Sequence, residues 1–137
     1  MDSIIALSNV CLLNYSACQL KLKNYHSVIQ SCTEVLKNDP ENIKAYFRRG
    51  KAYSNLNTHL ELAKKDFYKL KDIYNKHIEE EDSELMSVLP STNKLPSTNK
   101  LNYKNEIKNL NVEIRLLEKK IKQQNENEKS FFSKIFS

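Results

Sequence analysis

A cationic segment near the middle of the chain has the residue types that bind anions. It reads NIKAYFRRGKAY over residues 42–53, and Lys44 and Arg48 lie four positions apart. In a helix, residues i and i+4 lie on one face, one turn apart, so both cations would point the same way. Such cations bind carboxylates through charge-assisted hydrogen bonds, which are about twice as strong as neutral ones. The segment predicts either an anion-binding face or solvated surface charge.

The chain's single glycine, Gly50, lies inside the same predicted helix. Glycine in a helix interior costs about 1 kcal/mol relative to alanine. We therefore expect the backbone of another segment to pass too close to Gly50 for a side chain. Tyr46, Ala52 and Tyr53 give this helix an apolar side for packing.

Catalytic arrangements are not evident in the sequence. It contains no glycine-rich phosphate loop, no GxSxG turn and no HExxH motif. Glu61 and Asp66 are expected on a helix surface, without partners that would separate an acid from a base. His26, His59 and His77 match no metal-ligand spacing. We expect a non-enzymatic region that binds no metal or cofactor.

The cysteines and the N-terminal segment bear on the compartment. Cys11, Cys18 and Cys32 form no CxxC pair and leave one thiol over, which fits a reducing compartment. Free cysteines usually pack as small apolar residues, so we expect buried, inert thiols. Residues 1–18 lack a basic start and fall short of the ~20 apolar residues that span a bilayer. The cytosol or nucleus is the expected location.

Composition favours an all-α fold. The 137 residues include one Gly and three Pro, and strand-type alternation is absent. This length suffices for one domain with a modest core. The net charge of +5 comes mainly from lysine and fits either solvated surface or an anionic partner.

An internal repeat organises the first half of the chain. An offset of 34 residues aligns Ser16 with Gly50 and Cys18 with Ala52. A fixed period of this size predicts stacked supersecondary units. Two copies result, at about residues 9–42 and 43–76, within a repeat region of 1–80.

Each copy is expected to form two antiparallel helices. The apolar spacing predicts helices over residues 4–22, 25–37, 43–57 and 58–74. Pro40 cannot continue a helix, and Asn42 can cap the next one.

A polar linker is expected over residues 81–100. The acidic run at 79–84 suits a solvated helix end, and LPSTNK then occurs twice, at 89–94 and 95–100. So short a polar unit cannot bury enough apolar area to offset the entropy of ordering it.

An amphipathic helix is expected over residues 101–128, within a C-terminal segment of 101–137. Its apolar stripe comprises Tyr103, Ile107, Leu110, Ile114, Leu117 and Ile121. In a repeat array, a terminal helix covers the apolar face of the last repeat, and we expect this capping role. The alternatives are self-association through a coiled coil, a calmodulin target or a membrane-surface helix.

The 34-residue period resembles the tetratricopeptide (TPR) repeat. The match rests on Gly50, Ala63, Phe67 and Pro40. Residues 10–75 are similar to the second and third TPR repeats of FKBP-type immunophilins, through LNYSACQLKLKNYHSVIQSC, VLKNDPENIKAYFRRGKAY and LAKKDFYKL. NxKAYFRRG is typical of chaperone-binding TPR domains, and EKSFFSKIF resembles the end of the helix that follows the repeats. The resemblance implies an α-α superhelix.

The resemblance also implies a concave groove lined by the first helix of each repeat. Its expected lining is Val10, Asn14, Ala17 and Lys21 from the first copy and Lys44, Arg48, Lys51 and Asn55 from the second. In chaperone-binding TPR domains, five groove residues clamp the C-terminal Glu-Glu-Val-Asp of cytosolic chaperones. Three match here: Asn14 for the terminal carboxylate, and Lys44 and Arg48 for the final Asp and the residue before it. The other two, a Lys and an Asn, belong to an upstream repeat.

The implied function is a co-chaperone-type adaptor that binds the acidic C-terminal peptide of heat shock protein 90 or 70. One alternative is the non-catalytic tail of a peptidyl-prolyl isomerase whose catalytic domain lies upstream. Without an upstream repeat, we expect apolar side chains of the first helix, such as Ile4, Leu7 and Cys11, to be exposed.

Overall fold

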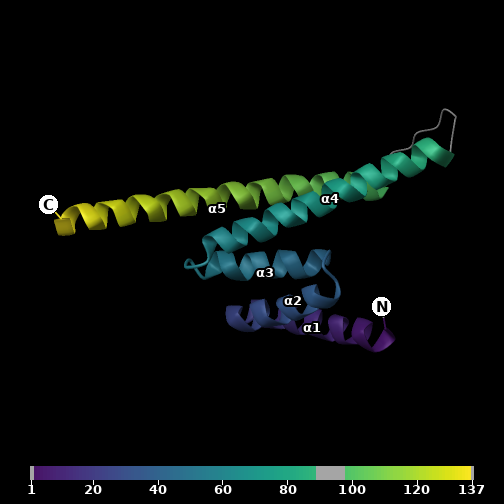
Figure 1. Cartoon of the computed structure of the whole chain (residues 1–137), viewed down its shortest axis with the longest axis horizontal. Coiled ribbons are helices and arrows are strands. Elements are labelled where there is room, and N and C mark those ends of the chain that lie inside the picture. Colours follow the sequence, from purple (N-terminus) through teal and green to yellow (C-terminus); the bar gives the residue numbers. More distant parts are fainter. Residues whose placement is uncertain (1, 89–97, 137) are drawn as a thin grey trace.

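In the part of the chain that the structure describes, five helices follow one another in alternating directions (Figure 1). A computed structural model describes residues 2–88 and 98–136. The helices are α1 (Ser3–Lys21), α2 (Tyr25–Asn38), α3 (Ile43–Asn55), α4 (Leu60–Val88) and α5 (Thr98–Phe136). Figure 1 shows α1 and α2 at one side of the stack, α3 in the middle, and α4 and α5 together at the other side. The described residues contain no strand, so the predicted all-α helical-repeat fold is confirmed.

The helix boundaries follow the expected start and stop signals. The side chain of Asn42 accepts a hydrogen bond from the backbone N–H of Ala45 at 2.9 Å and caps α3. α2 ends at Asn38, two residues before Pro40. Both signals were predicted from the sequence, and together they fix the turn between the two repeats.

The turn inside each repeat uses the same unusual backbone conformation. Lys23 and Asn57 have φ angles of 62° and 48°, and they are the only non-glycine residues with positive φ in the described part of the chain. They lie 34 residues apart, so the sequence period recurs in the backbone. At the end of α1, the N–H groups of Lys23 and Asn24 donate to the carbonyls of Leu20 and Gln19. These bonds satisfy carbonyls that a helix end leaves without partners.

Two apolar clusters hold the stack together. The first contains Val28, Cys32, Val35, Ala45 and Ala52. The second contains Leu60, Ala63, Phe67, Leu70, Tyr74, Leu110, Ile114 and Leu117. The first joins α2 to α3, and the second joins α4 to α5. Each helix is thus stabilised mainly by its neighbours in the chain, as expected for a helical-repeat array.

Gly50 has the close neighbour that its position predicted. A Cβ atom at this residue would lie 2.7 Å from Cε1 of Phe67, which is shorter than any normal contact. Phe67 belongs to α4, the helix paired with α3. The obstacle is therefore an aromatic ring of the partner helix, whereas we expected backbone.

The apolar stripe of α5 packs against α4. Leu110, Ile114 and Leu117 are buried in the second cluster, and Tyr103, Ile107 and Ile121 pack at its edge. The capping arrangement is confirmed. Because α4 covers the stripe, the expected alternative of self-association through residues 103–121 would require α4 and α5 to separate first.

The segment expected to be a linker is partly helical. α4 continues to Val88 and α5 begins at Thr98, so both ends of the expected linker at 81–100 belong to helices. Residues 89–97, which hold most of the LPSTNK duplication, lie outside the described residues. Glu and Lys are good helix formers, so the charged sequence extends α4. Lys100 also forms an ion pair with Asp82, which joins the two extended helix ends.

The outer side of α1 is apolar and uncovered. Its exposed large apolar side chains are Ile4, Ile5, Leu7, Val10 and Tyr15, and Leu22 is exposed just after the helix ends. Cys11 and Cys18 are exposed as well, so the expectation of buried thiols holds for Cys32 alone. The physical reason is that, among the described residues, α1 packs mainly against α2 and to a smaller extent against α3.

By length and composition, α1 could also cross a membrane, contrary to our expectation that the segment is too short. Core helices and signal sequences meet the same criterion, so the finding assigns no membrane role.

Candidate functional site

Three cations follow one face of α3. Lys44, Arg48 and Lys51 lie at i, i+4 and i+7, which places them on the same side of a helix. At 1.5 Å of rise per residue, the row is about 10 Å long. Lys44 is exposed, and the other two are partly buried.

Arg48 is fixed against α1. Its Nη1 atom donates a 2.7 Å hydrogen bond to the carbonyl oxygen of Leu13. The hydroxyl of Ser16 donates to the same oxygen, also at 2.7 Å. Leu13 directly precedes Asn14, so the guanidinium lies at the turn of α1 that carries this residue. A guanidinium has five N–H donors, and this contact leaves others for a ligand.

Of the three predicted clamp residues, Asn14 and Lys44 are exposed. Within the described part of the chain, neither side chain forms a hydrogen bond or an ion pair. Lys21, at the end of α1, is exposed in the same way. These polar groups can therefore bind a ligand without first breaking an internal contact.

The remaining groove candidates have internal partners or carry no charge. The side chain of Asn55 donates to the carbonyl of Lys51 at 2.8 Å and so satisfies the end of α3. Val10 is exposed and Ala17 is half-buried. None of these three adds a charged contact to the predicted groove.

Lys51 is paired with a carboxylate that the sequence interpretation missed. Its Nζ lies 3.0 Å from Oε1 of Glu113 in α5, and the two side chains are 34% and 32% exposed. Glu113 directly precedes Ile114 of the apolar stripe, so its position at the edge of the stripe is the only sequence signal. The ion pair joins two residues that are 62 positions apart in the sequence. The sequence spacing alone does not show that these two positions of α3 and α5 lie side by side.

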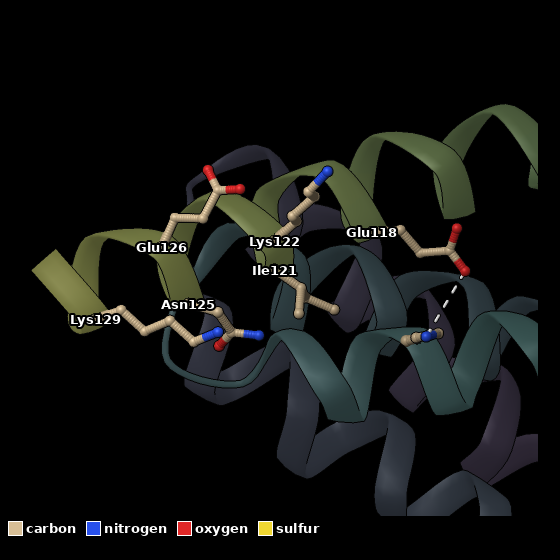
Figure 2. Close-up of a pocket in the computed structure, with 7 residues that line it drawn as sticks. Glu118, Ile121, Lys122, Asn125, Glu126 and Lys129 are labelled. Carbon is tan, nitrogen blue, oxygen red and sulfur yellow. Dashed lines mark ion pairs between the residues drawn. The ribbon is translucent and has the colours of Figure 1, made fainter.

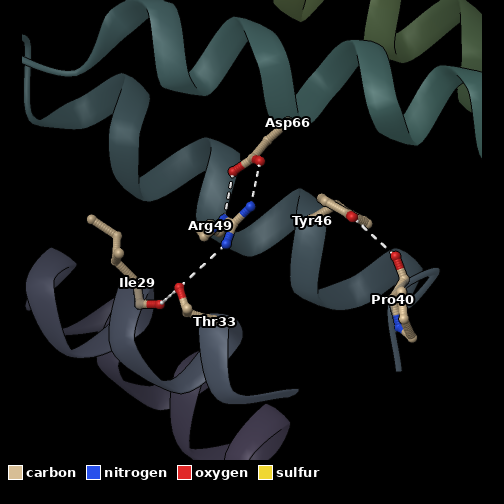
Figure 3. Close-up of polar contacts among 6 residues, drawn as sticks. All are labelled: Ile29, Thr33, Pro40, Tyr46, Arg49 and Asp66. Carbon is tan, nitrogen blue, oxygen red and sulfur yellow. Dashed lines mark hydrogen bonds and ion pairs between the residues drawn. The ribbon is translucent and has the colours of Figure 1, made fainter. Parts of the chain in front are cut away.

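The second arginine of the segment has a different environment. Figure 3 shows Arg49 between Asp66 of α4 and Thr33 of α2. Its Nε and Nη2 atoms donate to the two carboxylate oxygens of Asp66 at 2.8 and 2.7 Å. Asp66 is only 4% exposed, so its expected place on a helix surface was wrong. The hydrogen bonds to Asp66 raise the pKa of Arg49 and keep it charged.

The rings of Tyr46 and Tyr53 flank Arg49, with centroids 5.7 and 5.9 Å from its guanidinium carbon. Aromatic faces attract cations at this range. Figure 3 also shows the hydroxyl of Tyr46 donating to the carbonyl of Pro40, at 2.9 Å. Arg49 is therefore a structural cation, and Arg48 is the candidate for binding.

A shallow pocket of about 340 Å³ lies between α4 and the C-terminal half of α5. Figure 2 shows its lining, including Glu118, whose Oε1 lies 3.7 Å from Nζ of Lys64. Lysines and glutamates alternate around it, so their charges largely cancel. It has no clear preference for an anion and lies apart from the row of cations on α3.

Part of the chain is similar in sequence to known proteins. No protein-family model matches the chain. The class defined by the structure is an all-α helical repeat. The chain is 44% identical over 68 residues to peptidyl-prolyl cis-trans isomerase FKBP42 of Arabidopsis thaliana. It is 38% identical over 74 residues to peptidyl-prolyl cis-trans isomerase FKBP4 of Mus musculus.

These similarities cover 50% and 54% of this chain, but only 18% and 16% of the two relatives. The chain thus spans less than a fifth of the length of either protein. What is shown is a partial similarity to FKBP-type proteins over about half of the chain.

Proposed function

We propose that the chain is a TPR-type interaction module that binds the acidic C-terminal peptide of a cytosolic chaperone. The observation that carries the proposal is the arrangement on α1 and α3. Arg48 is held beside the turn that carries Asn14, and Lys44 is exposed one turn away. The partial similarity to FKBP-type proteins supports the same class of function.

A peptide that ends in Asp offers two carboxylates to this face. In the proposed complex, the amide of Asn14 donates to the terminal carboxylate. Lys44 and Arg48 bind the side chain of the final Asp and the group just before it. Bonds between such cations and carboxylates are charge-assisted and therefore stronger than neutral ones.

The affinity of residues 1–137 by themselves is expected to be low. The TPR resemblance implies five clamp residues, of which this sequence matches three, and each charge-assisted contact contributes about 1.5 to 3 kcal/mol. Without two contacts, an affinity in the micromolar range falls by two or more decades, toward about 1 mM. The expected complex is specific but weak.

The test is an NMR titration with an acetylated five-residue peptide ending in Glu-Glu-Val-Asp. The control is the same peptide with a C-terminal amide, which lacks the terminal carboxylate. We expect the acid to shift the backbone signals around Asn14, Lys44 and Arg48, and the amide to bind at least about tenfold more weakly because a charge-assisted contact is lost. Equal binding of the two peptides, or no binding of either, would overturn the proposal.

A second candidate function follows from the names of the relatives. Both are peptidyl-prolyl isomerases, so this chain would be a non-catalytic part of such an enzyme in the cytosol or nucleus. A prolyl-isomerase assay on the chain should then show no rate above the uncatalysed reaction, and measurable turnover would contradict this assignment. Calmodulin binding by α5 is not proposed, because α4 covers the apolar stripe that it would need.

A further inference from the structure

We infer that Glu113 sets the peptide specificity of this face by occupying Lys51. The inference rests on the proposed function and concerns the end of the groove nearest α5. Glu113 would then be a specificity-determining residue, although its side chain does not contact the residues that are proposed to bind the terminal Asp.

The row of cations on α3 is not uniform. Lys44 has no ion pair in the described residues, and Arg48 contacts only a carbonyl. Lys51 alone already has a carboxylate, that of Glu113, at 3.0 Å. The face is therefore cationic beside α1 and nearly neutral beside α5.

The spacing relates this difference to positions in the peptide. Lys44 and Lys51 are seven residues apart on α3, or about 10 Å along the helix. An extended peptide advances about 3.3 Å per residue, so about three peptide residues cover this length. If the final Asp binds at Lys44 and Arg48, an acidic residue two or three positions earlier is the one that would reach Lys51.

Such an acidic residue would have to displace Glu113. A new ion pair with Lys51 would then replace an existing one, and Glu113 would lose its partner beside the incoming negative charge. An upstream Glu in the peptide therefore adds little to the binding free energy in the native protein. The groove is expected to recognise the terminal Asp and to accept Glu or Gln equally well before it.

Removing the charge of Glu113 should make the groove discriminate between Glu and Gln at the upstream position of the peptide. In Glu113→Gln, Lys51 is free to bind an upstream carboxylate of the peptide. The net charge of the groove also rises by one, because a carboxylate is removed. Partly exposed ion pairs of this kind are modest, so we expect a gain of about threefold to tenfold for an acidic peptide.

The experiment compares two acetylated peptides, ending in Glu-Glu-Val-Asp and Gln-Gln-Val-Asp, by NMR titration of the full chain. The proteins are the native chain, Glu113→Gln, Glu118→Gln and the double variant Glu113→Gln/Lys51→Ala. Glu118→Gln is the matched control, because it removes the same charge from the same helix. Glu118 forms an ion pair with Lys64 of α4, the dashed line in Figure 2, and accepts a hydrogen bond from the hydroxyl of Tyr68, also in α4.

The native chain and Glu118→Gln should bind the two peptides within about twofold of each other, as expected where no net ion pair is gained. Glu113→Gln should prefer the Glu-Glu peptide by about threefold to tenfold, and Lys51→Ala in that background should abolish the preference. Binding by the native chain with no change in Glu113→Gln would overturn this inference alone. An absence of binding by all four proteins would overturn the proposed function as well.

Discussion

Arg49 and Asp66 form a two-point ion pair that links α3 to α4 beneath the surface. Both carboxylate oxygens of Asp66 accept hydrogen bonds from Arg49, which also donates to Thr33 in α2. One side chain thus connects three helices of the stack. Its neighbour in sequence, Arg48, contacts α1, so two adjacent arginines contribute to different surfaces.

The first prediction concerns this ion pair. Asp66→Ala leaves Arg49 charged and without its partner, and breaking a buried pair in this way costs about 3 kcal/mol. The lower end of the usual range applies because Arg49 keeps some contact with water. Urea unfolding followed by circular dichroism measures the change. Asp72→Ala, at an exposed position of the same helix, is the control, and equal effects of the two variants would contradict a structural role for Asp66.

Gly50→Ala should destabilise the fold, although alanine is the better helix former by about 1 kcal/mol. The new methyl group would lie 2.7 Å from the ring of Phe67, and overpacking of this kind typically costs about 1 to 3 kcal/mol. Unfolding curves should show a lower midpoint than those of Ser54→Ala, a half-buried control in α3. If the clash is the cause, Phe67→Leu should recover part of the loss in the double variant. A more stable Gly50→Ala protein would contradict the close approach.

Two substitutions separate binding from stability on the cationic face. Lys44→Ala should weaken peptide binding about tenfold or more, because a charge-assisted contact is lost, and should leave stability unchanged. Arg48→Ala should weaken binding similarly but also lower stability, since the Leu13 carbonyl loses a donor. Peptide titration measures the change in binding, and circular dichroism, which reports helicity during unfolding, measures the change in stability. Lys69→Ala, an exposed lysine on α4, is the charge-matched control and should bind normally.

The features that the sequence predicts correctly are those that depend on residues close together in the chain. The helix starts and stops near Pro40 and Asn42, and the closeness of a neighbour to Gly50, depend on local rules and were predicted. The partners of Asp66 and Lys51 were not, because they depend on how three or four helices are placed against one another. The extension of α4 was also missed, since an acidic run suits either a solvated helix or its end.

Cysteine accessibility provides an independent check on the packing of α1 and α2. Cys11 and Cys18 are exposed on α1, whereas Cys32 is buried in the first cluster. Iodoacetamide added to the native protein should modify Cys11 and Cys18 and leave Cys32 intact, as read by mass spectrometry. Urea should make all three reactive. Rapid native labelling of Cys32 would contradict the buried position.

The same thiol gives the stability a pH dependence. Burial raises the pKa of Cys32 above its ordinary value of 9.0. The unfolded chain therefore releases this proton at lower pH than the folded chain, and the free energy of unfolding falls as the pH rises above 9. Below that pH the contribution is fully present. Between pH 7.5 and 9.5, the native protein should lose more stability than Cys32→Ala, and parallel losses would contradict the prediction.

The paired turns at Lys23 and Asn57 have a consequence for the design of this fold. Both residues adopt a left-handed backbone conformation that costs most L-residues about 1 to 2 kcal/mol, and asparagine tolerates it better than lysine. The molecule therefore contains its own template for improvement, because the second repeat already carries the better residue at the equivalent position. Lys23→Asn would give the first turn the residue that the second repeat already carries, and it would relieve backbone strain there.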